Sequence, residues 1–249
     1  MTSSTALPPV STVLFDLYGT LVDIEVDEQA PELWRAMSSQ LQGHGVDFTP
    51  REARARFLEL CAAEPDEHHG SVLPSVFGRL LSENGHRVSA HDVVSLATVF
   101  RVMSIRSLSV RPYTWSLVTL LQRGGIRLGL VSNTESILSN FDLDVLGLRP
   151  AFQAIVLSSD LRLAKPDPRV MHSALRQLHA DPGMAVMVGD FWDTDIVGAR
   201  VAGLRAVYLQ PGDTAPTLPD PGRPGTAAVS ARPELKSLLD ALRTLGARI

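Results

Sequence analysis

The sequence contains a single cysteine, Cys61, among its 249 residues. An internal disulfide is therefore excluded, and this cysteine usage predicts a reducing, cytoplasmic environment. Long apolar runs are also lacking, because none approaches the roughly 20 residues that a membrane-spanning helix needs. The opening residues, MTSSTALPPVST, have no basic stretch followed by an apolar one, so we expect neither export nor membrane insertion.

Lysine is scarce, because 21 of the 23 basic residues are arginine and only Lys165 and Lys236 are lysine. The net charge is −4 and the basic residues are scattered, which argues against nucleic-acid binding. The chain is otherwise of ordinary globular composition, with 45% hydrophobic and 20% charged residues. A small-molecule substrate is the partner that we expect, and the sequence carries no indication of the oligomeric state.

Short apolar runs alternate with amphipathic segments along most of the chain. Val13 to Phe15 is the first such run, and it is followed at once by a turn at Gly19. Repeated units of this length predict an α/β fold, a doubly wound parallel sheet with helices on both faces. We expect the further strands at 128–131, 155–157, 186–188 and 206–209, the helices at about 112–124, 135–146, 168–178, 195–202 and from 233, and a loop over 210–225.

Residues 27–103 have a different character. Apolar residues recur there at helical spacing in four segments, for example Leu33, Met37 and Leu41, so we predict four helices and no strands. An insertion of this size is far longer than an ordinary connection between strands. We expect an all-helical cap over 25–106, inserted after the first strand of a core domain formed by 10–24 and 107–249.

Polar side chains follow four of the predicted strands. They are Asp16 in FDLYGTL, Ser132 and Asn133 in LVSNT, Lys165 in AKPDP, and Asp190 and Asp195 in VGDFWDTD. In an open parallel sheet, ligands bind beyond the carboxyl ends of the strands, so we expect these side chains to meet there. Asp193 lies in the same segment, and we interpret it as a solvated carboxylate at a helix start.

The expected cluster holds more negative than positive charge. Asp16, Asp190 and Asp195 would face one cation, Lys165, and three ionised carboxylates cannot stay together without further positive charge. A divalent ion that prefers oxygen ligands, such as Mg²⁺, would supply it and commonly bridges carboxylates to a substrate phosphate. Lys165 would then offset charge on phosphoryl oxygens, and Ser132 would donate a hydrogen bond to one of them.

These four segments resemble the motifs of the haloacid dehalogenase superfamily of hydrolases, in order and in spacing. The resemblance implies a Rossmann-like core with a helical cap. It implies a phosphatase in which Asp16 attacks phosphorus and forms an aspartyl-phosphate, with Ser132, Asn133 and Lys165 binding the phosphoryl group. Asp16, Asp190, Asp195 and the backbone carbonyl of Tyr18 would bind Mg²⁺, and Thr20 would orient Asp16 or the phosphate.

Tyr18 departs from the phosphatase pattern. Phosphatases of the superfamily usually read DxDGT in the first motif, with the second aspartate acting as acid and then base, whereas this chain reads DxYGT. Tyrosine is a poor base at neutral pH, since about one molecule in a thousand is ionised there. A magnesium-dependent phosphatase with this motif is therefore expected to break down its phosphorylated intermediate slowly, unless His68 or His69 in the cap supplies the base.

Two alternatives to a phosphatase of small metabolites stay open. DxYGT resembles the first motif of the metal-independent L-2-haloacid dehalogenases, and Arg35 in the segment LWR resembles their substrate-binding arginine. The acidic GDxxxxD segment at Asp190 instead resembles the fourth motif of the phosphatases, and we give it more weight, because paired carboxylates without a metal are costly to bury. The third reading is a catalytically impaired protein that binds a ligand.

Overall fold

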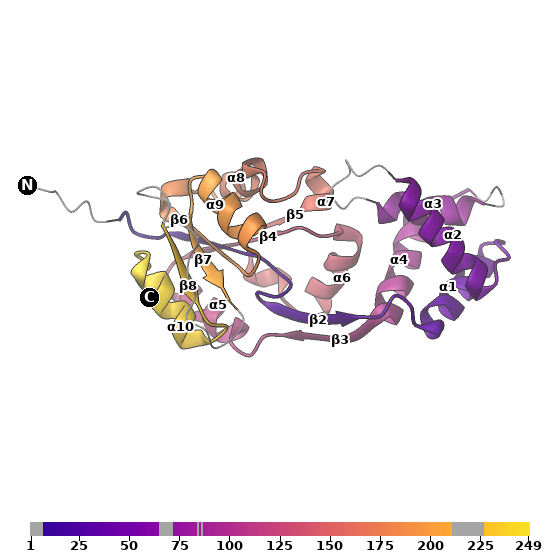
Figure 1. The fold of residues 1–249 in the computed structure, drawn as a ribbon, viewed down its shortest axis with the longest axis horizontal. Coiled ribbons are helices and arrows are strands. Elements are labelled where there is room, and N and C mark those ends of the chain that lie inside the picture. The colour runs from indigo at the N-terminus through magenta and orange to yellow at the C-terminus, as the bar shows by residue number, and fades with distance from the viewer. Residues whose placement is uncertain (1–6, 65–71, 84, 86, 211–226) are drawn as a thin grey trace, which may run out of the picture.

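A single parallel sheet forms the centre of the larger part of the chain (Figure 1). The structure is a computed structural model, and it describes residues 7–64, 72–83, 85, 87–210 and 227–249. The strand order is β5-β4-β1-β6-β7-β8. β1 lies between β4 and β6, so the residue that follows β1 emerges at the middle of the sheet edge. The strands are β1 (Thr12–Phe15), β4 (Arg127–Ser132), β5 (Ala154–Leu157), β6 (Ala185–Gly189), β7 (Arg205–Leu209) and β8 (Ala228–Ala231).

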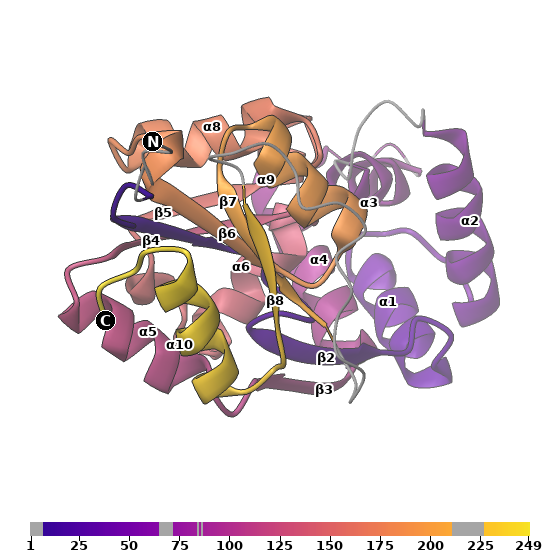
Figure 2. The ribbon, with the colours of Figure 1, turned by 60° about the vertical axis from the view of Figure 1, so that its left-hand side comes forward.

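Helices cover both faces of this sheet (Figures 1 and 2). α5 (Thr114–Arg123), α6 (Ser136–Val145) and α10 (Leu235–Thr244) pack on the face that carries Val13 and Phe15. α8 (Pro168–Gln177) and α9 (Val197–Val201) pack on the opposite face, against Leu14. Because successive side chains of a strand point to opposite faces, an uninterrupted apolar β1 contributes to both cores. The α/β fold predicted from the sequence is confirmed.

Four further helices form a separate layer at one end of the molecule, with a hydrophobic core of their own (Figure 1). They are α1 (Pro31–Gly43), α2 (Pro50–Ala63), α3 (Leu73–Ser82) and α4 (Ala90–Ser104). Trp34, Phe57, Phe77 and Phe100 meet at its centre, with the rings of Phe57 and Phe100 stacked 5.1 Å apart. The prediction of four helices between residues 27 and 103 is confirmed over the described residues. None of the described helices is long and apolar enough to cross a membrane.

An antiparallel ribbon joins the helical layer to the sheet. It consists of β2 (Val22–Val26) and β3 (Ile105–Val110), which enter and leave the four-helix layer side by side (Figure 1). Neither strand was predicted from the sequence, although Val22, Ile24 and Val26 alternate with acidic residues, which is the period of a half-buried strand. The predicted domain limits at 25 and 106 both fall within this ribbon, and they remain a prediction.

Smaller elements complete the described chain. The edge strand β8 and the short helix α7 (Ser158–Leu161) were not predicted from the sequence. The helix predicted from residue 195 begins earlier, as a π-helical turn, η4 (Trp192–Ile196), which continues into α9. Single 3₁₀ turns, η2 (Arg149–Ala151) and η3 (Pro182–Met184), precede β5 and β6. The loop predicted over 210–225 lies outside the described residues except for Gln210.

Helix α6 makes the contact between the sheet and the helical layer. Leu138 packs into the core of the four helices, and Ile137 packs against that core. At the start of α6, the Oε1 atom of Glu135 accepts hydrogen bonds from the backbone N–H groups of Val72 and Leu73, 2.6 and 3.0 Å away, at the beginning of α3. A carboxylate at a helix start satisfies N–H groups that lack an intrahelical partner, so these bonds attach α3 to the core.

Candidate active site

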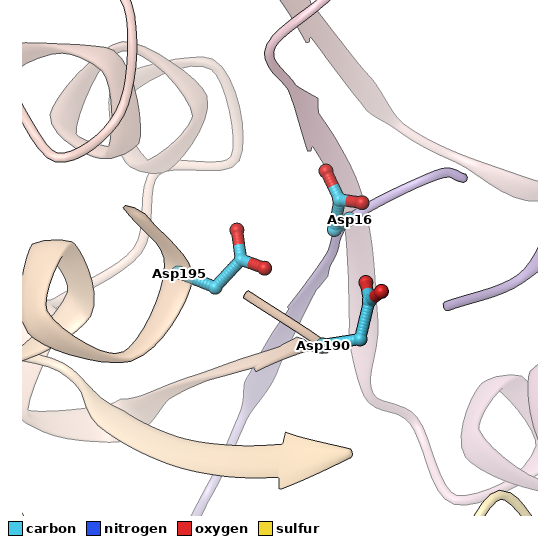
Figure 3. Close-up of side chains that lie close together, drawn as sticks. All are labelled: Asp16, Asp190 and Asp195. Carbon is cyan, nitrogen blue, oxygen red and sulfur yellow. The ribbon is translucent and has the colours of Figure 1, made fainter. Parts of the chain in front are cut away.

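The side chains that follow the strands converge at the carboxyl edge of the sheet, as predicted. Asp16 follows β1, Ser132 ends β4, Asp190 follows β6, and Asp195 lies in the turn η4. Figure 3 shows the three aspartates side by side at this edge. A cavity of about 270 Å³ opens beside Asp16 and Asp195. It is lined by Asp16, Tyr18, Ser132, Asn133, Lys165, Phe191, Thr194 and Asp195.

Lys165 occupies the centre of the buried charges. Its Nζ atom donates to Asp16 Oδ1 and Asp195 Oδ1, both 2.6 Å away, and to the carbonyl oxygen of Val131 at 2.8 Å. Burial opposes the charged ammonium, but the carboxylates of Asp16 and Asp195 outweigh burial and raise the pKa of Lys165. The side chain is therefore a fixed cation beside Asp16 at neutral pH, where it can offset charge on a bound anion.

Three carboxylates lie close to one another at this edge, and two of them bind Lys165. Asp16, Asp190 and Asp195 each offer an oxygen within 4.8 Å of the others. Burial raises the pKa of Asp190, and it raises the pKa of Asp195 to about 6. Both shifts mean that the carboxylates are poorly compensated by their surroundings, since burial disfavours the charged form. The single charge of Lys165 does not balance the cluster.

The backbone leaves room for these carboxylates at two glycines. A Cβ atom at Gly19 would lie 2.1 Å from Asp190 Oδ2, and one at Gly189 would lie 2.3 Å from Asp195 Oδ2. Gly19 also adopts a φ of +81°, a backbone conformation that residues other than glycine rarely adopt. The oxygens of Asp190 and Asp195 thus rest directly on peptide backbone. The donor set consists of hard oxygen ligands at short mutual distances, and it fits a divalent ion such as Mg²⁺.

Two polar side chains orient the charged residues rather than a ligand. Thr20 Oγ1 donates to Asp190 Oδ1 at 2.8 Å, whereas the sequence predicted that it would orient Asp16 or the phosphate. The side-chain amide of Asn133 makes two hydrogen bonds with the backbone of Lys165. Asn133 Oδ1 accepts from the Lys165 N–H at 2.8 Å, and Asn133 Nδ2 donates to the Lys165 carbonyl oxygen at 2.9 Å. The amide therefore fixes the loop that carries Lys165 against the end of β4.

Tyr18 faces the cavity, but its hydroxyl is held by other residues. The hydroxyl donates to Asp142 Oδ2 at 2.5 Å, lies 3.0 Å from Ser139 Oγ, and accepts a hydrogen bond from Arg101 Nη2 at 3.0 Å. Burial, reinforced by the charge of Asp142, raises the pKa of Tyr18. The hydroxyl is thus ionised even less at neutral pH than tyrosine in water, and the nearer of its two acceptors is Asp142.

Arg101 and Asp142 form a buried ion pair that the sequence analysis missed. Arg101 Nε lies 3.0 Å from Asp142 Oδ1, and Arg101 Nη2 contacts Asp142 Oδ2. Arg101 comes from the last helix of the four-helix layer, and Asp142 comes from α6 of the core. Arg101 lies on the buried face of α4 with Phe100 and Ser104, and Asp142 lies on the buried face of α6 with Leu138. A charged residue on the apolar face of a predicted helix was the sequence signal that could have revealed this pair.

The remaining predicted residues lie away from the cavity lining or outside the described chain. Arg35 is exposed on α1, with 65% of its side chain accessible, and pairs with Glu32 three residues earlier. Asp193 is exposed, in keeping with a solvated carboxylate. His68 and His69 lie outside the described residues. The sequence analysis did not single out Phe191, which lines the cavity although 66% of it is exposed.

Comparison with known proteins agrees with the fold. Residues 10–203 match the haloacid dehalogenase-like hydrolase family. A phosphoglycolate phosphatase from Cupriavidus necator is 29% identical over 96% of this chain and 93% of its own. A glyceraldehyde 3-phosphate phosphatase from Methanothermobacter thermautotrophicus is 28% identical over 80% of this chain and 85% of its own. The structure of a 2-haloacid dehalogenase from Pseudomonas syringae pv. Tomato superposes with a TM-score of 0.65 at 25% identity, covering 94% of this chain and 99% of that one. The chain belongs to the haloacid dehalogenase-like hydrolases.

Proposed function

We propose that this hydrolase is a magnesium-dependent phosphatase of small phosphorylated metabolites, which acts through an aspartyl-phosphate on Asp16. The observation that carries the proposal is the cluster of the buried Asp16 and Asp195 with the half-buried Asp190, in which Lys165 pairs with Asp16 and Asp195. A metal-independent reaction gives no reason to bring three carboxylates together at this site, because buried charge that is not compensated costs several kcal/mol, on the order of the whole stability of a domain.

Each residue of the cavity would have a separate role in the reaction. Asp16 attacks phosphorus with a carboxylate oxygen, and Lys165, already bonded to Asp16 Oδ1, offsets the charge on the transferring oxygens. Ser132 donates to the phosphoryl group from the end of β4, and Asn133 holds Lys165 in place. Asp16, Asp190, Asp195 and the carbonyl of Tyr18 would hold Mg²⁺, which when bound neutralises charge on the phosphate.

The named relatives support a phosphatase over a dehalogenase. The proteins from Cupriavidus necator and Methanothermobacter thermautotrophicus are both named as phosphatases, and both align over most of this chain. Glyceraldehyde 3-phosphate and phosphoglycolate are small, and a cavity of about 270 Å³ has room for substrates of that size.

Turnover of acetyl phosphate and p-nitrophenyl phosphate tests the proposal. We expect phosphate release with Mg²⁺, its loss on adding a chelator, and its loss in Asp16→Asn and Asp190→Asn. Arg35→Gln is a matched control on the exposed surface of α1, and it should leave turnover unchanged. If neither compound is hydrolysed and no phosphorylated protein is trapped with Mg²⁺, the proposal is wrong.

The second candidate is a metal-independent 2-haloacid dehalogenase. It is favoured by Tyr18 in the first motif and by the fold similarity to the Pseudomonas syringae enzyme. In that reaction Asp16 would displace halide from carbon, and the departing ion needs no proton. Chloride release from 2-chloropropionate that persists in chelator would establish this activity. If Asp16→Asn preserved the cellular role of the protein, binding without chemistry would be favoured instead.

A further inference from the structure

Phe191 is a large apolar side chain that lines the active-site cavity and is nevertheless 66% exposed. Isolated exposed apolar residues are common on protein surfaces and need no explanation there. A ring that lines a cavity differs, because a ligand that enters the cavity removes water from the ring and gains free energy by doing so. Phe191 is therefore placed to contact a ligand bound in the cavity.

The backbone of Phe191 is fixed on both sides by Asp195. The N–H of Phe191 donates to Asp195 Oδ2 at 3.0 Å, and the carbonyl oxygen of Phe191 accepts from the N–H of Asp195 at 2.9 Å. Phe191 also directly follows Asp190, whose Oδ1 accepts from Thr20 Oγ1 at 2.8 Å. The main chain that carries the ring is thus held in place by the acidic cluster itself, and the ring can move only by rotation of its own side chain.

The neighbouring Trp192 shows how an aromatic side chain of this turn packs when it supports the fold. Its ring meets the ring of Tyr208 edge-on, with centroids 5.3 Å apart. It also packs against the hydrophobic core on the α8 and α9 side of the sheet. Support of the fold therefore explains Trp192, whereas the exposed ring of Phe191 still has apolar surface that a ligand can cover.

Charge and exposure divide the cavity into two ends. The buried end holds Asp16, Lys165 and Asp195, which are joined by hydrogen bonds of 2.6 Å. The exposed residues of the described lining are Phe191 and Asn133, and Asn133 commits its amide to the backbone of Lys165. A phosphoryl group bound at the buried end would place the organic group attached to it at the exposed end, beside the ring of Phe191.

We propose, building on the phosphatase function above, that Phe191 is a specificity-determining residue and that the preferred substrates are phosphate monoesters whose organic part presents an apolar ring next to the phosphate. The buried end binds the phosphoryl group, whichever organic group it carries. The ring of Phe191 contacts that organic group, and aromatic rings favour one another in offset or edge-on contacts. Small hydroxylated phosphates still fit the cavity, but they do not gain from this contact and are poorer substrates.

The test compares two alkyl phosphates, so that the leaving oxygen is that of a simple alcohol in both. Benzyl phosphate carries a ring and glycerol phosphate carries hydroxyls, and kcat/KM for phosphate release is measured with Mg²⁺. We expect kcat/KM for benzyl phosphate to be at least about tenfold higher, which is the selectivity that a small apolar contact supplies. Phe191→Ala should remove most of this preference by lowering kcat/KM for benzyl phosphate alone. Phe191→Leu keeps an apolar side chain and should retain part of the preference.

Val201→Ala is the matched control. Val201 lies on α9, is exposed to a similar extent, and is not among the described residues of the cavity lining, so this variant should keep the preference of the parent protein. Equal or better turnover of glycerol phosphate by the parent protein would overturn the proposal. An equal loss for both compounds in Phe191→Ala would also overturn it, because the ring would then support the site or contact the helical layer instead of the substrate.

Binding without turnover separates this proposal from the phosphatase function. Benzylphosphonate and methylphosphonate carry a phosphorus–carbon bond in place of the phosphate ester bond, and their affinities are measured by calorimetry with Mg²⁺. We expect benzylphosphonate to bind the parent protein at least about tenfold more tightly than methylphosphonate, and Phe191→Ala to bind the two about equally. Equal binding by the parent protein would overturn the role of Phe191 even if phosphates are hydrolysed. Selective binding without hydrolysis of any phosphate would support the role of Phe191 and contradict the phosphatase function alone.

Discussion

Replacing Asp142 by asparagine tests whether the buried ion pair holds the helical layer on the core. The side chains of Arg101 and Asp142 are only 10% and 1% accessible, so Asp142→Asn leaves a buried guanidinium without its counter-charge. Removing one partner of such a pair costs about 3–5 kcal/mol. The amide oxygen still accepts one hydrogen bond, so we expect the lower end, about 3 kcal/mol, and a fall in Tm of about 6–12 °C for a chain of this size.

Urea denaturation and thermal unfolding measure this loss, and the chain offers a matched control. Asp144 lies two residues along the same helix, where it is 61% accessible and pairs with Arg149 at 2.6 Å. Asp144→Asn should change stability little, because exposed ion pairs contribute little. The double variant Arg101→Met and Asp142→Leu should recover most of the loss, because both charges are removed together. If Asp142→Asn costs no more than Asp144→Asn, the pair does not stabilise this contact and the reasoning fails.

Three further predictions concern the site itself. Gly19→Ala would place Cβ 2.1 Å from Asp190 Oδ2, so we expect Mg²⁺ binding, measured by calorimetry, to weaken at least about tenfold. Gly45→Ala is the control, because Gly45 has a similar φ of +79° but no atom near its Cβ. This variant should bind Mg²⁺ like the parent protein. Because burial raises the pKa of Asp195 to about 6, protons compete with the cation for this carboxylate below that pH. Mg²⁺ affinity should therefore fall about tenfold per pH unit in calorimetric titrations below about pH 6. An affinity that is constant down to about pH 5 would contradict Asp195 as a metal ligand. Since Tyr18 is a poor base, rapid mixing with p-nitrophenyl phosphate should show a burst of about one phenolate per chain before slow turnover, and a linear trace would contradict slow breakdown.

The sequence was sufficient to predict five of the six strands of the sheet and the convergence of its polar ends, whereas the edge strand β8 was missed. Strands such as Val186–Val188 are short, apolar and bounded by turns, and that information is local to each segment. Once the strands are parallel, their carboxyl ends must lie on one edge, so Asp16, Lys165 and Asp195 meet there without any knowledge of side-chain contacts.

Contacts between distant segments could not be predicted in the same way. The hydroxyl of Tyr18 meets Asp142, 124 residues away, and Thr20 meets Asp190, 170 residues away. Such pairings depend on how the segment after β1 packs against α6 and against the end of β6, which periodicity does not specify. The periodicity does place Asp142 on the apolar face of its helix, and this is the one local sign that the carboxylate has a buried partner.

Trapping the phosphorylated intermediate shows whether Asp16 carries the phosphoryl group. The protein is mixed with radiolabelled acetyl phosphate and Mg²⁺, quenched in acid and digested, and the labelled peptide is identified by mass spectrometry. We expect label on the peptide that contains Asp16, no label when a chelator replaces Mg²⁺, and none in Asp16→Asn. Substrate consumed without label on Asp16, or equal labelling in the presence of chelator, would contradict this expectation.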